Sequence, residues 1–163
     1  MTIRLACPSD AVSILRVHQE AILARAADYY ARSILQAWAR GATPDRIARL
    51  EKQIADPGFV VLIAETGDEV IGYGMAVPSR QQLRALYVKP NEIGRVGDSL
   101  LGELEKLAFR TSEVLTCDAS LNAVAFYKAH GYTEEGSADH VLSSGISIPC
   151  KRMKKVRSAK SAS

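Results

Sequence analysis

The sequence has no apolar run long enough to span a bilayer. Its first ten residues, MTIRLACPSD, lack the apolar core and the small-residue cleavage site of a signal peptide. These absences favour a cytoplasmic protein with no membrane partner. A chain of 163 residues, 47% hydrophobic and 24% charged, can bury one core without disulfides or metals. We therefore expect an ordinary globular protein.

Cysteine is also scarce. Cys7, Cys117 and Cys150 are widely spaced and include no C-x-x-C pair. An odd number without such pairs argues against a disulfide framework and against a zinc site, so no metal is expected. Cys117 and Cys150 lie in strand-like runs, where a free cysteine usually acts as a small hydrophobe. A catalytic thiol is the less favoured alternative.

Acidic residues are absent from residues 151–163, which hold six of the 21 basic residues. Residues 1–150 therefore carry 15 basic and 18 acidic residues, although the net charge of the chain is +3. A mildly acidic body does not look like a nucleic-acid-binding domain, so we expect no nucleic-acid partner. We expect one domain over residues 1–155 and a disordered basic tail over 156–163. The alternative is an interaction protein that binds a partner through this tail.

Hydrophobic periodicity and turn residues give an order of elements. The expected strands are 2–6, 59–65, 70–77, 82–88 and 113–119, with a closing hairpin in 140–153; the expected helices lie in 7–26, 43–57, 97–110 and 121–132, with an aromatic stretch over 28–38. Hairpins make antiparallel neighbours, whereas the helix at 97–110 lets the strands around it run parallel. The expected fold class is α/β, with a three-layer, mixed and mostly antiparallel sheet that has helices on both faces.

Two segments carry the functional signal. In LRALYVKPNEIGRVGDSLL, a strand is followed by a glycine loop that opens an amphipathic helix. Free N–H groups at a helix N-terminus bind anions such as pyrophosphate, and glycine lets the backbone approach them closely. In TCDASLNAVAFYKAHGY, Asn122, Phe126, Tyr127, Gly131 and Tyr132 keep a fixed spacing.

Together and in this order, the two motifs resemble those of the GNAT superfamily of N-acetyltransferases, which use acetyl-coenzyme A (acetyl-CoA). The stretch LIAETGDEVIGYGMAV also resembles the strand–turn–strand of this family, and the resemblance covers residues 2–155. It implies a GNAT-type fold, acetyl-CoA as co-substrate, and direct acetyl transfer to a primary amine of a small-molecule or peptide acceptor. The alternative is a catalytically weak GNAT-like module that binds or senses acyl-CoA.

The resemblance also implies which residues hold the cofactor. They are Leu86, Tyr87, Val88, Ile93, Gly94, Arg95, Val96, Gly97, Asp98, Ser99, Asn122 and Lys128. Two alternatives stay open, Asn122 as a helix cap and Lys128 as a solvent-facing residue. The loop departs from the usual family pattern, because Glu92 stands where Gln or Arg is expected and Arg95 where glycine is expected. Counted forward from Val88, it is instead one residue short. Either alignment leaves fewer flexible donors and weakens cofactor affinity.

The resemblance assigns Tyr127 as the general acid that protonates the leaving thiolate. A phenol with a pKa of about 10 suits a thiol of similar basicity. The alternative is a core tyrosine beside Phe126. No general base is evident, because QLRALYV contains no carboxylate. Candidates for the base are Glu65, Asp118, Glu20 and His18, although a histidine on an apolar helix face is more often a core residue.

The acceptor site is expected near Tyr29, Tyr30, Trp38 and Arg84. In relatives the first helices and their linker cover the acceptor, and Arg84 is placed to meet an acidic group. The alternatives are aromatics that only pack the helix pair and an arginine that is only solvated. The sequence leaves open a homodimer formed through the last strands.

Overall fold

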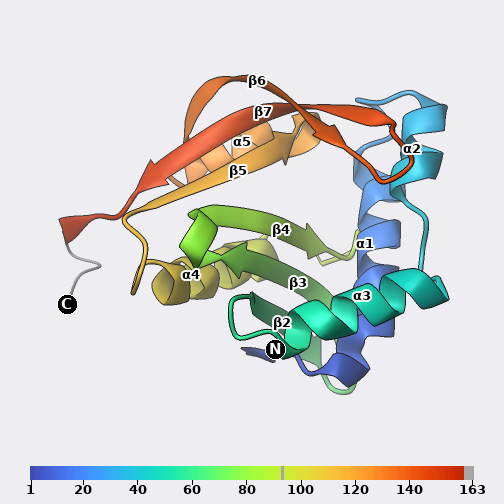
Figure 1. Ribbon diagram of the computed structural model, residues 1–163, viewed down its shortest axis with the longest axis horizontal. Helices are drawn as coiled ribbons and strands as arrows, with labels where there is room; N and C mark the ends of the chain where they lie inside the picture. The colour runs from blue at the N-terminus through green and yellow to red at the C-terminus, as the bar shows by residue number, and fades with distance from the viewer. Residues whose placement is uncertain (93, 160–163) are drawn as a thin grey trace.

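The computed structural model describes residues 1–92 and 94–159; residues 160–163 of the expected tail, and Ile93 of the expected cofactor loop, lie outside the described residues. Its strands form one seven-stranded sheet in the order β1-β2-β3-β4-β5-β7-β6, in which only β4 and β5 pair in parallel (Figure 1). The strands are β1 (Thr2–Leu5), β2 (Val60–Thr66), β3 (Glu69–Val77), β4 (Gln82–Val88), β5 (Val114–Ser120), β6 (Thr133–Val141) and β7 (Ser147–Val156), and the α-helices are α1 (Ala11–Arg25), α2 (Arg32–Trp38), α3 (Pro44–Ala55), α4 (Arg95–Ala108) and α5 (Val124–Ala129).

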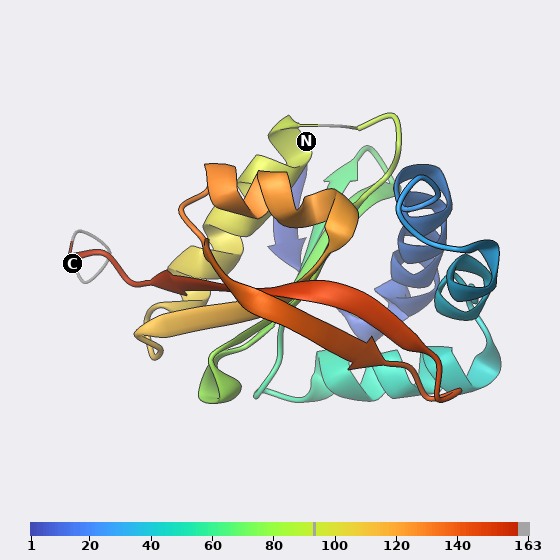
Figure 2. The ribbon, with the colours of Figure 1, turned by 90° about the horizontal axis from the view of Figure 1, so that it is seen from above.

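Helices cover both faces of the sheet. Figure 2 shows α4 and α5 on one side and α3 on the other, with α1 and α2 at one end. The core divides accordingly: Leu100 and Leu104 of α4 pack in one buried cluster with β2, β3 and β5, while Leu15 of α1 and Leu50 of α3 pack on the opposite face. The expected three-layer, mostly antiparallel α/β fold is confirmed. No helix among the described residues is long and apolar enough to cross a membrane.

Element boundaries differ from expectation at the start of α4, at β6 and at the C-terminal end. Helix α4 begins at Arg95, so Gly97 lies inside its first turn instead of before it. Strand β6 begins at Thr133, although TEEGSADHV shows no apolar alternation, because this polar strand is held by its ladder with β7. The C-terminal end is also more ordered than expected at 156–157. Val156 ends β7, and Arg157 donates hydrogen bonds to the carbonyls of Glu113 and Phe109.

Two glycines in β3 bring α4 close to the sheet. A Cβ atom at Gly74 would lie 2.3 Å from Leu104 Cδ1, and one at Gly72 would lie 3.0 Å from Leu100 Cδ1 and 3.2 Å from the Tyr87 carbonyl oxygen. Both leucines are fully buried, so neither has room to move aside. The absence of side chains at these two positions therefore sets the distance between α4 and the sheet.

Gly74→Ala is expected to lower the free energy of unfolding by about 1–3 kcal/mol, because the added methyl group overpacks the contact with Leu104. Urea denaturation measures the change. Gly102→Ala on α4 is the matched control: a Cβ there meets no atom within 4 Å. It should be neutral or stabilising by up to about 1 kcal/mol, as for alanine replacing glycine in a helix. Equal stability of Gly74→Ala and the wild type would contradict this close contact.

Candidate active site

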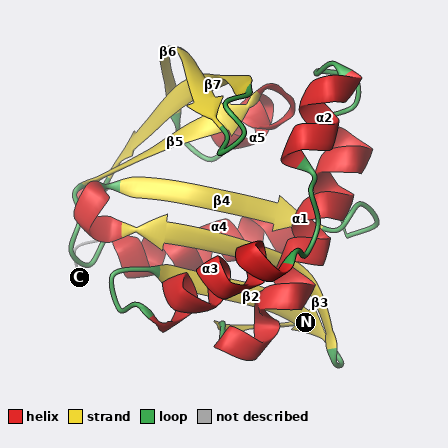
Figure 3. Ribbon diagram, turned by 45° about the vertical axis from the view of Figure 1, so that its right-hand side comes forward, coloured by secondary structure: helices red, strands yellow, loops and turns green. Residues whose placement is uncertain are grey.

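The parallel strands β4 and β5 separate almost as soon as they meet. Only one residue pair, Gln82 with Thr116, joins them in register, supported by a 2.8 Å hydrogen bond from the Thr116 N–H to the Gln81 carbonyl. The carboxyl-terminal halves of the two strands then diverge, as the views in Figures 1 and 3 both show. The middle of the sheet therefore opens toward α1 and α5.

This opening leaves part of the β4 backbone without a strand partner. The N–H of Lys89 donates to the Ile71 carbonyl of β3 at 2.8 Å. Because successive N–H and C=O groups alternate sides along a strand, those of Leu86 and Val88 face the opening instead. A ligand with amide groups can complete this edge as an extra strand would.

The N-terminus of α4 lies where the chain leaves β4. Gly94 has φ +89°, which favours glycine, and it is exposed with nothing within 4 Å of a Cβ. The first backbone hydrogen bond of this turn joins the Asp98 N–H to the Gly94 carbonyl, so the preceding N–H groups of the helix have no acceptor within it. Arg25, at the end of α1, braces the preceding loop: its Nη2 donates to the carbonyls of Lys89 at 3.0 Å and Pro90 at 3.4 Å.

The expected loop residues divide into two groups. Gly94, Arg95 and Asp98 are exposed, whereas Val96 and Gly97 are buried. A Cβ at Gly97 would lie 3.4 Å from the Phe126 ring, so this glycine lets α4 pack against α5.

Asp98 is already paired. One of its carboxylate oxygens lies 3.0 Å from His130 Nε2, and His130 Nδ1 lies 2.8 Å from the Phe126 carbonyl oxygen. The first turn of α4 and the end of α5 are thus joined through polar groups.

Asn122 and Lys128 follow β5. Asn122 Oδ1 is buried and has no hydrogen-bond partner among the described residues, so it does not act as a helix cap. An unpaired buried oxygen costs free energy unless a ligand or water supplies a donor. Lys128 is exposed and forms no ion pair within the described chain.

Tyr127 lies in α5 and is 6% exposed. Its ring packs at centroid distances of 5.4 Å against Phe126 and 5.3 Å against Tyr132. Burial first, and then the neighbouring Cys117 and Tyr87, raise the pKa of Tyr127 well above its usual value. Tyr127 therefore stays protonated throughout the physiological range.

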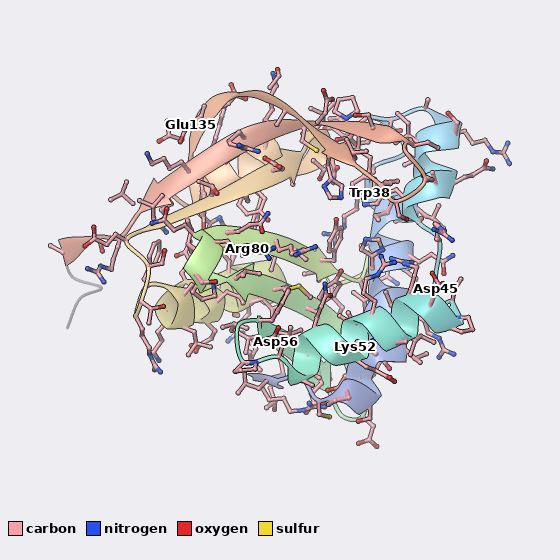
Figure 4. All side chains as sticks on the ribbon, in the orientation of Figure 1. Trp38, Asp45, Lys52, Asp56, Arg80 and Glu135 are labelled. Atoms are coloured by element: carbon pink, nitrogen blue, oxygen red, sulfur yellow. The ribbon has the colours of Figure 1, made fainter. Side chains whose placement is uncertain are left out.

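A cavity of about 540 Å³ lies on the opposite, α1–α3 side of the opening. Residues from α1, α2, α3, both strands beside the opening and the β6–β7 turn line it. Trp38 of α2, Asp45 of α3 and Arg80 between β3 and β4 belong to its wall and are labelled in Figure 4. Volumes of this size are typical of sites for small molecules.

A β-bulge turns Arg84 toward this cavity. Met75 pairs with Ala85 and Ala76 pairs with Leu83, so Arg84 is an extra residue on β4. Its guanidinium carbon lies 5.8 Å from the centroid of the Phe59 ring on the α3 side. Without the bulge, strand alternation would place Arg84 on the same face as Leu86, toward α4.

The expected acceptor residues are not all in one place. Trp38 and Arg84 line the cavity, whereas Tyr29 and Tyr30 do not belong to its lining. Tyr29 is 53% exposed. The Tyr30 hydroxyl donates to the Pro149 carbonyl at 2.6 Å and accepts from the Leu121 N–H at 2.9 Å, so it joins the α1–α2 connection to β7 and to the end of β5.

The candidate bases are also dispersed. Glu20 is exposed and Glu65 pairs with Arg4; neither lines the cavity. Asp118 lines it but pairs with Arg152 at 2.8 Å. His18 lines it as well, with its ring 4.7 Å from that of Tyr87 and its Nδ1 unpartnered among the described residues.

Burial acts on His18 most strongly. Burial, followed by the charges of Arg46 and His140, lowers the pKa of His18 to about 3. A neutral imidazole with so low a pKa is a weak base. The same cause raises the pKa of the buried thiols, to about 12 for Cys117 and about 11 for Cys150, which keeps both protonated near neutral pH.

Sequence reasoning missed most of the charged residues in the cavity wall. They are Arg40, Asp45, Arg46, Arg49, Arg80 and His140. One signal was available: the three-residue spacing of Arg46 and Arg49 places them on the same side of α3. No signal in the sequence links α3 to Arg80.

Comparison with known proteins identifies the family. The acetyltransferase (GNAT) domain family matches residues 25–153, which is most of the chain. The chain belongs to the GNAT acetyltransferase family. No protein with curated function gives a match.

Solved structures agree with this GNAT assignment. A GCN5-related N-acetyltransferase from Rhodopseudomonas palustris is 30% identical with a TM-score of 0.84, over 96% of this chain and 95% of the other. The ribosomal-protein-alanine N-acetyltransferase of Brucella melitensis is 25% identical with a TM-score of 0.67, over 96% and 100%. The PaiA N-acetyltransferase of Thermoplasma acidophilum, solved with coenzyme A, shares the fold at 20% identity with a TM-score of 0.75, over 96% and 98%.

The imidazole of His18 is expected to stay neutral from about pH 8 down to about pH 4. Since the unfolded chain binds this proton with a pKa of about 6.5, stability should fall as the pH drops from about 6.5 toward 3. NMR titration of the imidazole resonances tests the first statement, and urea denaturation at several pH values tests the second. His18→Leu should show a smaller acid-dependent loss than the wild type. An observed pKa near 6.5 for His18 would contradict its burial.

Proposed function

We propose that this protein is an N-acetyltransferase that moves an acetyl group from acetyl-CoA to a primary amine by direct attack. The proposal rests on the opening between β4 and β5. Backbone and side-chain groups suited to binding a cofactor lie on one side of it, and the cavity lies on the other. The family match and the coenzyme A bound to a neighbour of the same fold support it.

The chain's own groups fit such a cofactor on the α4–α5 side. The N–H groups at the start of α4, around Gly94, would hold the pyrophosphate, with Arg95 and Lys128 as nearby exposed cations. The free backbone edge of Leu86 and Val88 would pair with the pantetheine amides. The unpartnered oxygen of Asn122 would accept from the same arm. When bound, the cofactor supplies an activated acetyl thioester.

Tyr127 is the proposed general acid, and it would donate its phenolic proton to the departing sulfur. Its raised pKa means that the proton is present at every physiological pH. The same rise makes transfer of the proton less favourable than from a solvated phenol. Tyr127 would therefore carry its proton whenever the thiolate leaves, but its raised pKa limits how much it accelerates acetyl transfer.

Neither of the candidate bases that line the cavity is suited to neutral pH. Asp118 is held by Arg152, and the pKa of His18 is too low for effective proton abstraction. The acceptor amine would then have to enter in its neutral form.

The unsuitability of both candidate bases favours a second candidate function, a GNAT-like protein that binds acyl-CoA with little turnover. Tight binding of coenzyme A by calorimetry, with no free thiol released from acetyl-CoA and a broad panel of amines, would favour this second function. Robust release of thiol with any amine would eliminate it.

Tyr127→Phe is expected to lower kcat by about 100-fold or more, at the low end of general acid contributions, with little change in KM for acetyl-CoA. The assay is release of free thiol during acetyl transfer to an amine. Unchanged kcat would mean that Tyr127 is only a core residue.

Tyr132→Phe is the matched control for Tyr127→Phe. The Tyr132 ring belongs to the same buried cluster, and its hydroxyl interacts with the Glu105 carboxylate and not with the opening. Removing this hydroxyl should leave kcat unchanged. Equal losses in the two variants would indicate a packing effect instead of proton donation.

We also expect kcat/KM for the acceptor to rise about tenfold per pH unit from pH 6 up to the pKa of the amine, which is about 10 for an alkylamine. The reason is that only the neutral amine attacks and that neither Asp118 nor His18 removes its proton. Tyr127 adds no alkaline fall below about pH 10, because its pKa is raised. A plateau already reached near pH 7 would reveal a working base.

A further inference from the structure

We propose that the acceptor of this enzyme is a small amine that carries at least two negative charges, as carboxylate or phosphate, bound by the arginines of the cavity. This inference rests on the proposed acetyl transfer and names the substrate class for it. Three observations support it. The cavity wall is basic, the acidic residues of the protein balance little of this charge, and the cavity has the size of a small-molecule site.

Five arginines from three parts of the fold line this cavity. They are Arg40 after α2, Arg46 and Arg49 on α3, Arg80 before β4 and Arg84 on the β4 bulge. Figure 4 shows the side chains of α3 and of β4 around the space that Arg80 and Trp38 also border. Both the helix and the strand that border the cavity therefore contribute positive charge to its wall.

These arginines are not neutralised by the protein. None of the five forms an ion pair with a described residue. Arg46 donates to the Gly41 carbonyl, and Arg84 lies over the Phe59 ring. Burial is the main cause that lowers the pKa of Arg46; the like charges of Arg40 and Arg49 add to it, and Tyr73 and Asp45 oppose it. Repulsion of this kind disfavours the empty site and is relieved by an anion.

The carboxylates of the cavity do not compensate for this charge. Only Asp45 and Asp118 belong to the described lining, and the Asp118 carboxylate is bound by Arg152, which lies outside this cavity. The remaining balance is five guanidinium groups against Asp45. A polycationic amine would be repelled here, whereas an anionic one would be attracted.

The deep part of the cavity suits the amine end of such a ligand. His18 is neutral and buried, its Nδ1 has no partner among the described residues, and Tyr87 of β4 lies beside it. Tyr87 stands between Leu86 and Val88, whose backbone groups face the opening. An amine held near His18 would thus lie next to the place where the acetyl group is proposed to arrive.

Guanidinium geometry indicates which anions fit. A guanidinium group binds carboxylate or phosphate through two parallel N–H donors, and several such groups favour a multiply charged ligand. A volume of about 540 Å³ holds a small metabolite and not a folded protein surface. Carboxylate and phosphate share this chemistry, so the test includes both.

The experiment compares matched acceptor pairs in the thiol-release assay. The pairs are glutamate against glutamine and glucosamine 6-phosphate against glucosamine, with spermidine as a polycation. We expect kcat/KM to be at least tenfold higher for the anionic member of at least one pair, and the pair that responds distinguishes carboxylate from phosphate. Arg49→Gln and Arg84→Gln should each raise KM for the anionic acceptor by about tenfold or more and so remove most of this preference.

Arg16→Gln is the matched control, because Arg16 is exposed on α1 and does not line the cavity. It should leave every acceptor constant unchanged. KM for acetyl-CoA should also stay constant in all three variants. Preference for the neutral or cationic acceptors, or an anion preference that survives both cavity substitutions, would overturn the inference.

A binding measurement separates this inference from the proposed function. Calorimetry with citrate as the probe is performed on protein saturated with coenzyme A, which cannot transfer an acetyl group. Citrate binding that Arg49→Gln weakens, with no turnover of any amine, would support the anion site and reject acetyl transfer. Turnover of neutral amines without citrate binding would reject the anion site alone, and the absence of both binding and turnover would reject both.

Discussion

The divergence of β4 and β5 from a single residue pair is the constraint on which the site depends. Gln82 and Thr116 hold the strands together at one end, and no further pair closes the sheet beyond them. The groups proposed to hold the cofactor and to protonate the thiolate lie at the open end: the free edge of β4, the start of α4, and α5 after β5. Two glycines in β3 maintain this arrangement, because they let α4 pack closely on the neighbouring strand.

The opening gives the molecule two sides with different chemistry. The α4–α5 side offers backbone donors and one unsatisfied amide oxygen, which suit a long ligand with phosphates and amides. The α1–α3 side offers a basic cavity with an aromatic and imidazole floor. Arg25 joins the sides, since it extends from α1 to the loop that leads into α4.

Much of the α4–α5 side was predictable, because it is built from residues adjacent in sequence. The motif around Gly94 and the helix around Tyr127 each carry their own spacing, and the predicted fold was confirmed. The start of α4 was misplaced because Gly97 was interpreted as a loop residue, whereas it packs on Phe126. Strand β6 was largely missed because only its ladder with β7 identifies it. The arginines of the cavity come from distant segments, and tertiary packing alone brings them together.

The bulge at Arg84 changes the charge of the cavity wall without changing the fold of the sheet. Both neighbouring residue pairs, Met75 with Ala85 and Ala76 with Leu83, are kept on either side of it. Loss of Arg84 would leave a regular ladder in which Leu83 and Ala85 keep their present faces. One inserted residue therefore adds a positive charge to the cavity wall, and neither neighbouring strand has to shift to accommodate it.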